Sequence, residues 1–228
     1  MKRTMTAGLL LCALCATAGI HPDTTEKGWR NLLGEGPLEA VADFKSGTWQ
    51  RDGKDGITST VDSALWFKGE YENFVLDFEY KLDPEANSGV IIYCSDLKNW
   101  IPNSVEIQLL DDFGSKWRND PPRLKNGSLY GHIGPEKSAV KPAGEWNRMT
   151  VWAKGRNVKV AVNGELSVDV DLSKYTNAKV NPDGTPVQPW LSKPMAELPT
   201  KGGIGLQGKH GGACPYFRNV RILELGKK

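Results

Sequence analysis

Hydrophobic and polar residues alternate with a period of two along much of the chain. The clearest case is residues 74–82, where every second residue is apolar. Side chains of a β-strand point alternately to opposite faces, so this segment predicts a strand with one face in the core and one in water. The pattern recurs at 158–162 and 165–172, on either side of Asn163-Gly164. That pair tolerates the positive φ of a type I′ turn and predicts a hairpin.

Further short strands are predicted where alternation or a short apolar run is bounded by turn residues. They are residues 88–94, 105–110, 128–133, 148–153, 203–207 and 216–223. No long helical stripe competes with them. Closely spaced strands separated by Gly, Pro and Asn predict an all-β fold, a sandwich or jelly roll of two stacked sheets. Residues 177–200, with five prolines, predict a long loop of the kind that is usually functional or disordered.

The size of the chain suits one such sandwich. Its 228 residues leave no room for a second domain, and 25 Gly and 14 Pro are typical of a folded protein rich in turns. We therefore expect a single domain over residues 19–228.

The first 18 residues have the features of a signal peptide. Lys2 and Arg3 precede an apolar run from Ala7 to Ala16, and small residues follow at the spacing that a signal peptidase reads. The apolar run is too short to cross a bilayer as a helix. We expect cleavage after Ala18 and an exported protein, periplasmic or extracellular, with no membrane insertion.

Removal of this leader makes the chain formally neutral. The full sequence has 29 Lys and Arg against 27 Asp and Glu, and the loss of two leader cations leaves 27 of each. A neutral surface gains little from counterion release, which argues against nucleic acid as a partner. Cys94 and Cys214 remain, either as a disulfide or as separate thiols. No motif predicts a zinc site, and the sequence requires no cofactor.

Candidate chemistry lies on the predicted strand 105–110. Glu106 and Gln108 share one face of this strand, and the residues between them share the other. The pair is either a solvated strand surface or a carboxylate displayed beside an amide. Trp100 and Trp117 flank the strand in adjacent loops, as core residues or as platforms for the C–H face of a sugar. We expect a carbohydrate site on an open sheet face.

Retaining glucanase chemistry does not fit this strand. Jelly-roll glucanases carry Glu, Asp and Glu on one strand face, and retaining hydrolysis needs two carboxyl groups about 5 to 5.5 Å apart. Gln108 stands at the middle position and cannot titrate. Asp111 is an odd number of residues from Glu106, so it points to the opposite face unless a bulge intervenes.

A series of short motifs extends over nearly the whole chain, from about Trp29 to Leu225. They are Asn87-Ser88-Gly89-Val90, Glu106-Ile107-Gln108 with Asp111, Gly127-Ser128-Leu129-Tyr130-Gly131, Gly144-Glu145-Trp146-Asn147, Asn163-Gly164, Gly205-Leu206-Gln207 with His210-Gly211, and Phe217-Arg218-Asn219. In this order they resemble the 3-keto-disaccharide hydrolase family. The resemblance implies a concanavalin A-like jelly roll of two antiparallel sheets that cleaves glycosides whose sugar carries a ketone at C3.

Such a substrate makes sense of a single carboxylate. The ketone acidifies the C2 proton, a base removes it, the enolate is stabilised as an oxyanion, and the glycosidic oxygen leaves from C1 before water adds. The resemblance implies Glu106 as base or acid, His210 as its partner and Asp111 as a further catalytic candidate. Expected substrate contacts, beside the two tryptophans Trp100 and Trp117, are Gln108, Arg218, Tyr130 and Asn87.

These residues also have structural interpretations. His210 lies in a glycine-rich turn, Arg218 can pair with an acid across the sheet, and Asn87 can cap a turn. His21 falls in a start that we expect to be unstructured. For the whole chain, the alternative is a non-catalytic glycan-binding module that uses the same face. The glycan, the product and the oligomeric state stay open.

Overall fold

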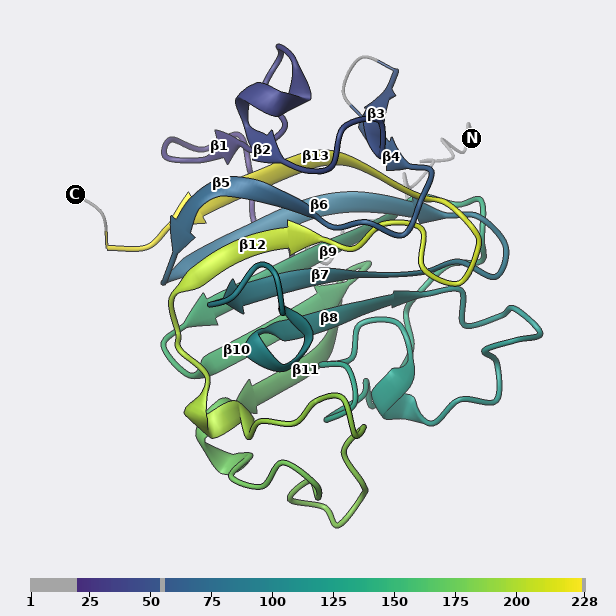
Figure 1. Ribbon diagram of the computed structural model, residues 1–228, viewed down its shortest axis with the longest axis vertical. Coiled ribbons are helices and arrows are strands. Elements are labelled where there is room, and N and C mark those ends of the chain that lie inside the picture. The colour runs from purple at the N-terminus through teal and green to yellow at the C-terminus, as the bar shows by residue number, and fades with distance from the viewer. Residues whose placement is uncertain (1–19, 54–55, 227–228) are drawn as a thin grey trace, which may run out of the picture.

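The protein is a sandwich of two antiparallel sheets, seen in a computed structural model that describes residues 20–53 and 56–226 (Figure 1). The larger sheet has the strand order β11-β10-β9-β6-β13-β4-β3, with β1 added beside β13. The smaller sheet has the order β2-β5-β12-β7-β8. The predicted all-β, jelly-roll-like architecture is confirmed. The predicted signal peptide, residues 1–18, lies outside the described residues.

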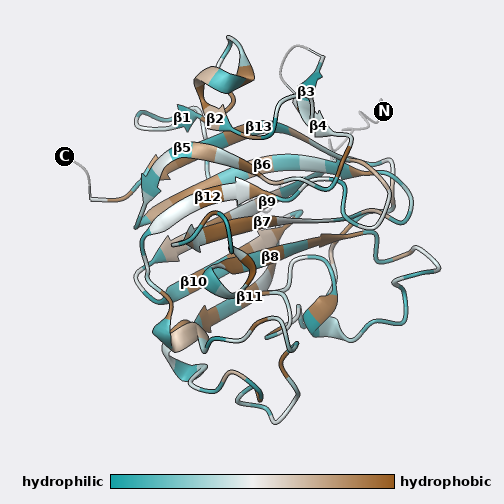
Figure 2. Ribbon diagram, in the orientation of Figure 1, coloured by the Kyte–Doolittle hydropathy of each residue, from teal (hydrophilic) through white to brown (hydrophobic). Residues whose placement is uncertain are grey.

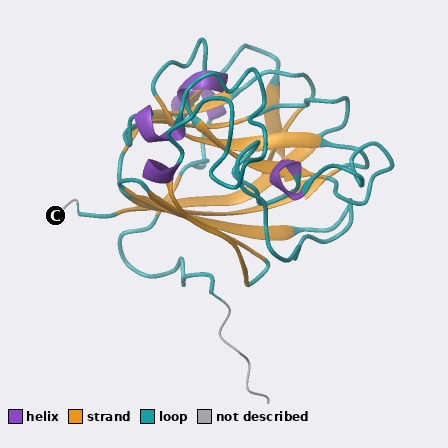
Figure 3. Cartoon of the chain, turned by 90° about the horizontal axis from the view of Figure 1, so that it is seen from below, coloured by secondary structure: helices purple, strands orange, loops and turns teal. Residues whose placement is uncertain are grey.

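The larger sheet contains β1 (Arg30–Asn31), β3 (Trp49–Asp52), β4 (Gly56–Ser59), β6 (Phe74–Leu82), β9 (Asn147–Lys154), β10 (Asn157–Val162), β11 (Glu165–Asp171) and β13 (Pro215–Glu224). The smaller sheet contains β2 (Ala42–Asp43), β5 (Leu65–Tyr71), β7 (Asn87–Cys94), β8 (Val105–Leu110) and β12 (Gly202–Leu206). Short 3₁₀ helices lie in the loops outside the two strand layers (Figure 3): η1 (Leu38–Ala40), η2 (Ile101–Asn103), η3 (Pro122–Leu124), η4 (Leu172–Lys174) and η5 (Met195–Glu197).

The alternating segments form strands as predicted. β6 and β8 have the predicted bounds, and Asn163 and Gly164 adopt φ of 49° and 89° at the turn between β10 and β11. Leu166 was expected to face inward with its neighbours but is 46% exposed. The register between β10 and β11 shifts at this point, so the inward phase begins only at Val168.

Residues 128–133 do not form the predicted strand. The chain reverses at Gly131, whose φ is +78°, and only single bridges join Leu129 to Ile107 and to Ile133. Residues 49–52, 56–59 and 65–71 form strands that the alternation did not reveal.

The hydrophobic core lies between the sheets. The inward residues of β6 and β9 pack against those of β7 and β8, and Figure 2 shows hydrophobic residues concentrated along β7 and β8. Phe78, Phe217, Val90 and Ile107 are fully buried. Each such side chain contributes about 1.5 to 3 kcal/mol relative to an exposed one. Because β8 turns its apolar residues inward, its polar residues face outward.

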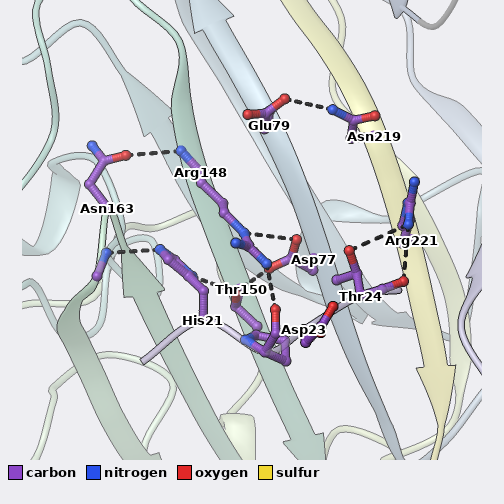
Figure 4. A network of polar contacts seen from close by, with 12 residues as sticks. His21, Asp23, Thr24, Asp77, Glu79, Arg148, Thr150, Asn163, Asn219 and Arg221 are labelled. Atoms are coloured by element: carbon purple, nitrogen blue, oxygen red, sulfur yellow. Dashed lines mark hydrogen bonds and ion pairs between the residues drawn. The ribbon is translucent and has the colours of Figure 1, made fainter. Parts of the chain in front are cut away.

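The N-terminal segment 20–25 lies across the outer face of the larger sheet (Figure 4). His21 Nδ1 is 2.7 Å from Thr150 Oγ1, and His21 Nε2 accepts a hydrogen bond from the Gly164 amide at 2.8 Å. Arg148 donates to the Pro22 carbonyl at 2.7 Å. Residue 21 is therefore ordered, and the expectation of an unstructured start is wrong at this position.

This segment explains a buried charge on β6. Asp77 was expected to face water but is only 4% exposed, and it forms an ion pair with Arg148 at 3.0 Å. Burial raises the pKa of Asp77, against the opposing effects of Thr150 and Arg148. Burial, with the charge of Arg148, lowers the pKa of His21 to about 4.

Candidate functional site

A pocket of about 260 Å³ lies on the outer face of the smaller sheet. The sheet contributes Asn87, Glu106, Gln108 and, directly after β12, Gln207. The surrounding loops contribute Trp100, Ile101, Tyr130, Trp190 and His210. Glu106 and Gln108 thus share a pocket with His210, as predicted.

The long excursion 177–200 borders this pocket through Trp190. Figure 1 shows the excursion in yellow-green at the bottom of the view, beyond β8 and β11. Sequence reasoning did not single out Trp190, because no periodicity relates a residue in a Pro-rich loop to a particular face.

Strand alternation places Glu106 on the outer face. Its neighbours Val105 and Ile107 are buried in the core, and Glu106 lies opposite Ile91 of β7. A Cβ atom on Gly89 would collide with Glu106 Oε1 and would lie 2.8 Å from Cγ. The glycine therefore creates the space in which the carboxyl lies against β7.

The carboxyl of Glu106 is poorly hydrated. The residue retains partial exposure because it lines the pocket, yet burial raises its pKa to about 8. Among residues 20–53 and 56–226, none donates a hydrogen bond to this carboxyl, so nothing offsets the lost hydration. The sheet face was expected to be open to solvent, but the Glu106 side chain on this face is only partly exposed. Burial thus favours the protonated form of this carboxyl near neutral pH.

Amide groups beside Glu106 are available to a ligand. Gln207 Oε1 is buried and has no hydrogen-bond partner in the described chain. A buried acceptor without a partner costs about 1 to 3 kcal/mol, which a ligand hydroxyl would offset. The Gln108 amide makes one long hydrogen bond, of 3.4 Å, to the Leu124 carbonyl. Gln207 lies within a motif noted in the sequence but was not identified there as a site residue.

Aromatic side chains form the rest of the lining. Trp100 packs edge-on against Trp66, with ring centroids 6.4 Å apart, whereas Trp190 is 50% exposed. Burial raises the pKa of Tyr130, the charge of Glu106 adds to this, and a hydrogen bond with Trp190 opposes it. Flat apolar faces beside amide and carboxyl groups suit a ring with both C–H and hydroxyl groups.

His210 is held from two sides. Its backbone forms an isolated β-bridge with Asn87, and its Nδ1 is 2.8 Å from Asp62 Oδ2. Asp62 lies 148 positions away in a loop with no recognisable motif, so sequence reasoning missed it.

Three predicted site residues do not line the pocket. Asp111 accepts backbone hydrogen bonds from Glu85 at 2.9 Å and Phe113 at 3.3 Å, and thereby holds a turn. The Trp117 indole donates to the Glu85 carbonyl at 2.9 Å.

Arg218 belongs to the other sheet. It donates from Nε to Glu79 at 2.7 Å and lies 3.9 Å over the Trp146 ring. The cross-sheet pairing noted as its alternative role is the one observed. Asp111, Trp117 and Arg218 are thus corrected to structural positions, whereas the other six predicted residues meet in the pocket.

The remaining reactive groups lie apart. Cys94 and Cys214 are free thiols, and burial raises the pKa of Cys94 to about 11. Within the described ranges, no group of three or more His, Cys, Asp or Glu side chains could hold a metal ion. No helix in the same part of the chain is long and apolar enough to cross a membrane.

A two-sheet β-sandwich with a pocket of carboxyl, amide and aromatic groups is typical of carbohydrate-active jelly-roll proteins. Residues 23–223 match the 3-keto-alpha-glucoside-1,2-lyase-like domain, and the chain belongs to this family.

Individual relatives agree with this assignment. A 3-keto-disaccharide hydrolase of Bacteroides thetaiotaomicron is 26% identical, over 90% of this chain and 77% of its own length. The crystal structure of a candidate glycosyl hydrolase from Parabacteroides distasonis is 46% identical, with a TM-score of 0.82 over 86% of this chain and 99% of that chain. A Bacillus subtilis protein with a galectin-like fold has a TM-score of 0.50 at 11% identity, over 86% of this chain and 94% of that chain, and shares the fold alone.

Proposed function

We propose that this protein cleaves glycosides that carry a 3-keto sugar, by elimination followed by hydration. One observation carries the proposal: Glu106, a carboxyl group whose pKa is raised by burial, shares a sugar-sized pocket with the histidine His210. The family to which the chain belongs, and the hydrolase relative, support the choice of a 3-keto substrate.

The pKa of Glu106 decides between its two roles. With a pKa of about 8, the carboxyl can donate a proton near neutral pH but accepts one poorly. We therefore assign Glu106 as the acid that protonates the leaving glycosidic oxygen. His210 is then the base that removes the C2 proton.

The elimination balances with these two groups. His210 takes the proton from C2, and the C–H electrons form an enolate with the C3 ketone. The enolate then collapses to a C1=C2 bond while the C1–O bond breaks, and Glu106 supplies a proton to the departing oxygen. The amides of Asn87 and Gln108 line the same pocket and are suited to stabilise the enolate oxygen.

Hydration reverses the roles. The Glu106 carboxylate takes a proton from water while the water oxygen adds to C1. Protonated His210 then returns a proton to C2. Both residues recover their starting states, so the net reaction is hydrolysis.

The experiment compares a 3-keto-disaccharide with the same disaccharide unoxidised, in D₂O, with products read by mass spectrometry. We expect cleavage of the oxidised substrate alone, with deuterium at C2 of the product. Glu106→Gln should abolish most of this turnover, whereas Glu165→Gln, an exposed glutamate on the larger sheet, should not. Absence of turnover on every keto-sugar, with retained glycan binding, would support the non-catalytic binding module instead.

We also propose that the protein is exported after cleavage behind Ala18. Basic residues, a short apolar run and small residues in succession support this. N-terminal sequencing of the protein secreted by its host should begin at Gly19, and recovery of intact Met1 would contradict export by this route.

A further inference from the structure

His210 lies in a glycine-rich turn. Backbone contacts hold this turn against a second loop, residues 61–63. The Lys209 amide donates to the Val61 carbonyl at 2.8 Å. A Cβ atom on Gly208 would lie 2.5 Å from the Val61 oxygen and 2.6 Å from the Ser63 oxygen. Only glycine permits this approach, so the residues before His210 are held against residues 61–63.

This contact brings one carboxylate to the histidine ring. Asp62, at the centre of the second loop, has Oδ2 2.8 Å from His210 Nδ1. An ionised carboxylate can only accept a hydrogen bond, so Nδ1 carries the proton of the neutral ring. The lone pair of that ring is then on Nε2, the nitrogen that is free to act as a base on a ligand.

We propose that Asp62 is a positioning residue that fixes the orientation and tautomer of His210 for proton removal. The inference rests on the proposed function, because only a reaction in which His210 acts as a base requires the ring to present Nε2. The β-bridge between Asn87 and His210 fixes the backbone on the side of the pocket, and Asp62 fixes the ring.

A purely structural ion pair is the competing explanation. The two side chains are 50% and 57% exposed, and ion pairs this exposed to solvent add little to the stability of the fold. Stability is therefore a weak reason for the contact. A partner that orients the ring, in contrast, is effective even when its interaction with the histidine is weak, because it only has to favour one of two tautomers.

The test uses Asp62→Asn and the conservative Asp62→Glu. We expect kcat on a 3-keto-disaccharide to fall about 10- to 100-fold in Asp62→Asn, the usual effect of losing a supporting partner. KM should change little, and Asp62→Glu should recover part of the rate. Asp169→Asn is the matched control, because Asp169 forms an exposed 2.7 Å ion pair with Lys159 on the larger sheet. It should leave kcat unchanged.

A second measurement does not depend on turnover. Nitrogen NMR of the His210 ring should show the Nδ1-protonated tautomer in the parent protein and a mixture in Asp62→Asn. An unchanged tautomer in Asp62→Asn, or unchanged kcat in an active enzyme, would overturn the inference. A parent protein that is inactive on all keto-sugars would refute the proposed reaction, and the NMR result would then decide whether Asp62 holds the ring.

Discussion

The carboxyl of Glu106 lies against the Cα atom of Gly89, so closely that a methyl group on Gly89 would overlap it. The two residues sit on paired strands, and Gly89 itself lies opposite Gln108. The absence of a side chain at one position thus sets the position of a functional group on the neighbouring strand.

Gly89→Ala should therefore displace the Glu106 carboxyl. We expect turnover to fall about 10- to 100-fold, since small misplacements of a catalytic group are costly. Overpacking should lower the free energy of unfolding by about 1 to 3 kcal/mol. Gly36→Ala is the control, because nothing lies within 4 Å of a Cβ at that position. Wild-type turnover in folded Gly89→Ala would show that the carboxyl tolerates the shift.

Glu106→Gln should keep the shape of the side chain and remove its proton chemistry. Loss of one general acid or base usually lowers the rate by about 10²- to 10⁴-fold. Substrate affinity should survive, because the amide still forms hydrogen bonds. Calorimetric binding measured beside kcat separates the two effects, and retained turnover would remove Glu106 from the mechanism.

The pKa of Glu106 is about 8, against an ordinary 4.5. It therefore predicts a pH dependence of stability opposite to that of a salt-bridged carboxylate. The folded protein holds the proton more tightly, so this contribution to stability is complete below pH 4.5 and is lost as pH rises through 8. Melting temperature should fall more between pH 5 and 9 in the parent than in Glu106→Gln. Parallel curves for the two proteins would refute the raised pKa.

The site was predictable from the sequence only where strand alternation or a motif fixed a side chain. Glu106 and Gln108 follow from the period of two, since alternate residues of β8 leave the core. The prediction of Asp111 as a site residue fails because Asp111 lies beyond the end of that strand, where its carboxylate accepts hydrogen bonds from backbone amides. Asp62 and Trp190 come from loops, and tertiary contacts, which have no local signal, bring them to the pocket.

His21 gives a prediction on the opposite face of the molecule. The pKa of His21, about 4, lies below the ordinary 6.5. The stabilisation that His21 gives to segment 20–25 on the larger sheet is therefore complete above pH 6.5 and is lost as pH falls through 4. Arg148 and the buried Asp77 face it from the sheet, and Asp23 is close by in the same segment. Hydrogen exchange of the Gly164 amide, which donates to His21, should accelerate relative to other turn amides as the pH falls. His21→Ala should remove that pH dependence.

Trp190 tests whether the long excursion contributes to ligand binding. Half of its surface is exposed although it lines the pocket, as expected for a ring that a ligand covers. An aromatic stacking contact is worth about 0.5 to 1.5 kcal/mol, so Trp190→Ala should raise KM or Kd about 2- to 12-fold. The rate at saturation should change little, because no proton passes through the indole. Val180→Ala, at an exposed apolar residue of the same excursion that does not line the pocket, is the control and should bind as the parent does. Equal affinity in Trp190→Ala and Val180→Ala would make the excursion a structural insertion.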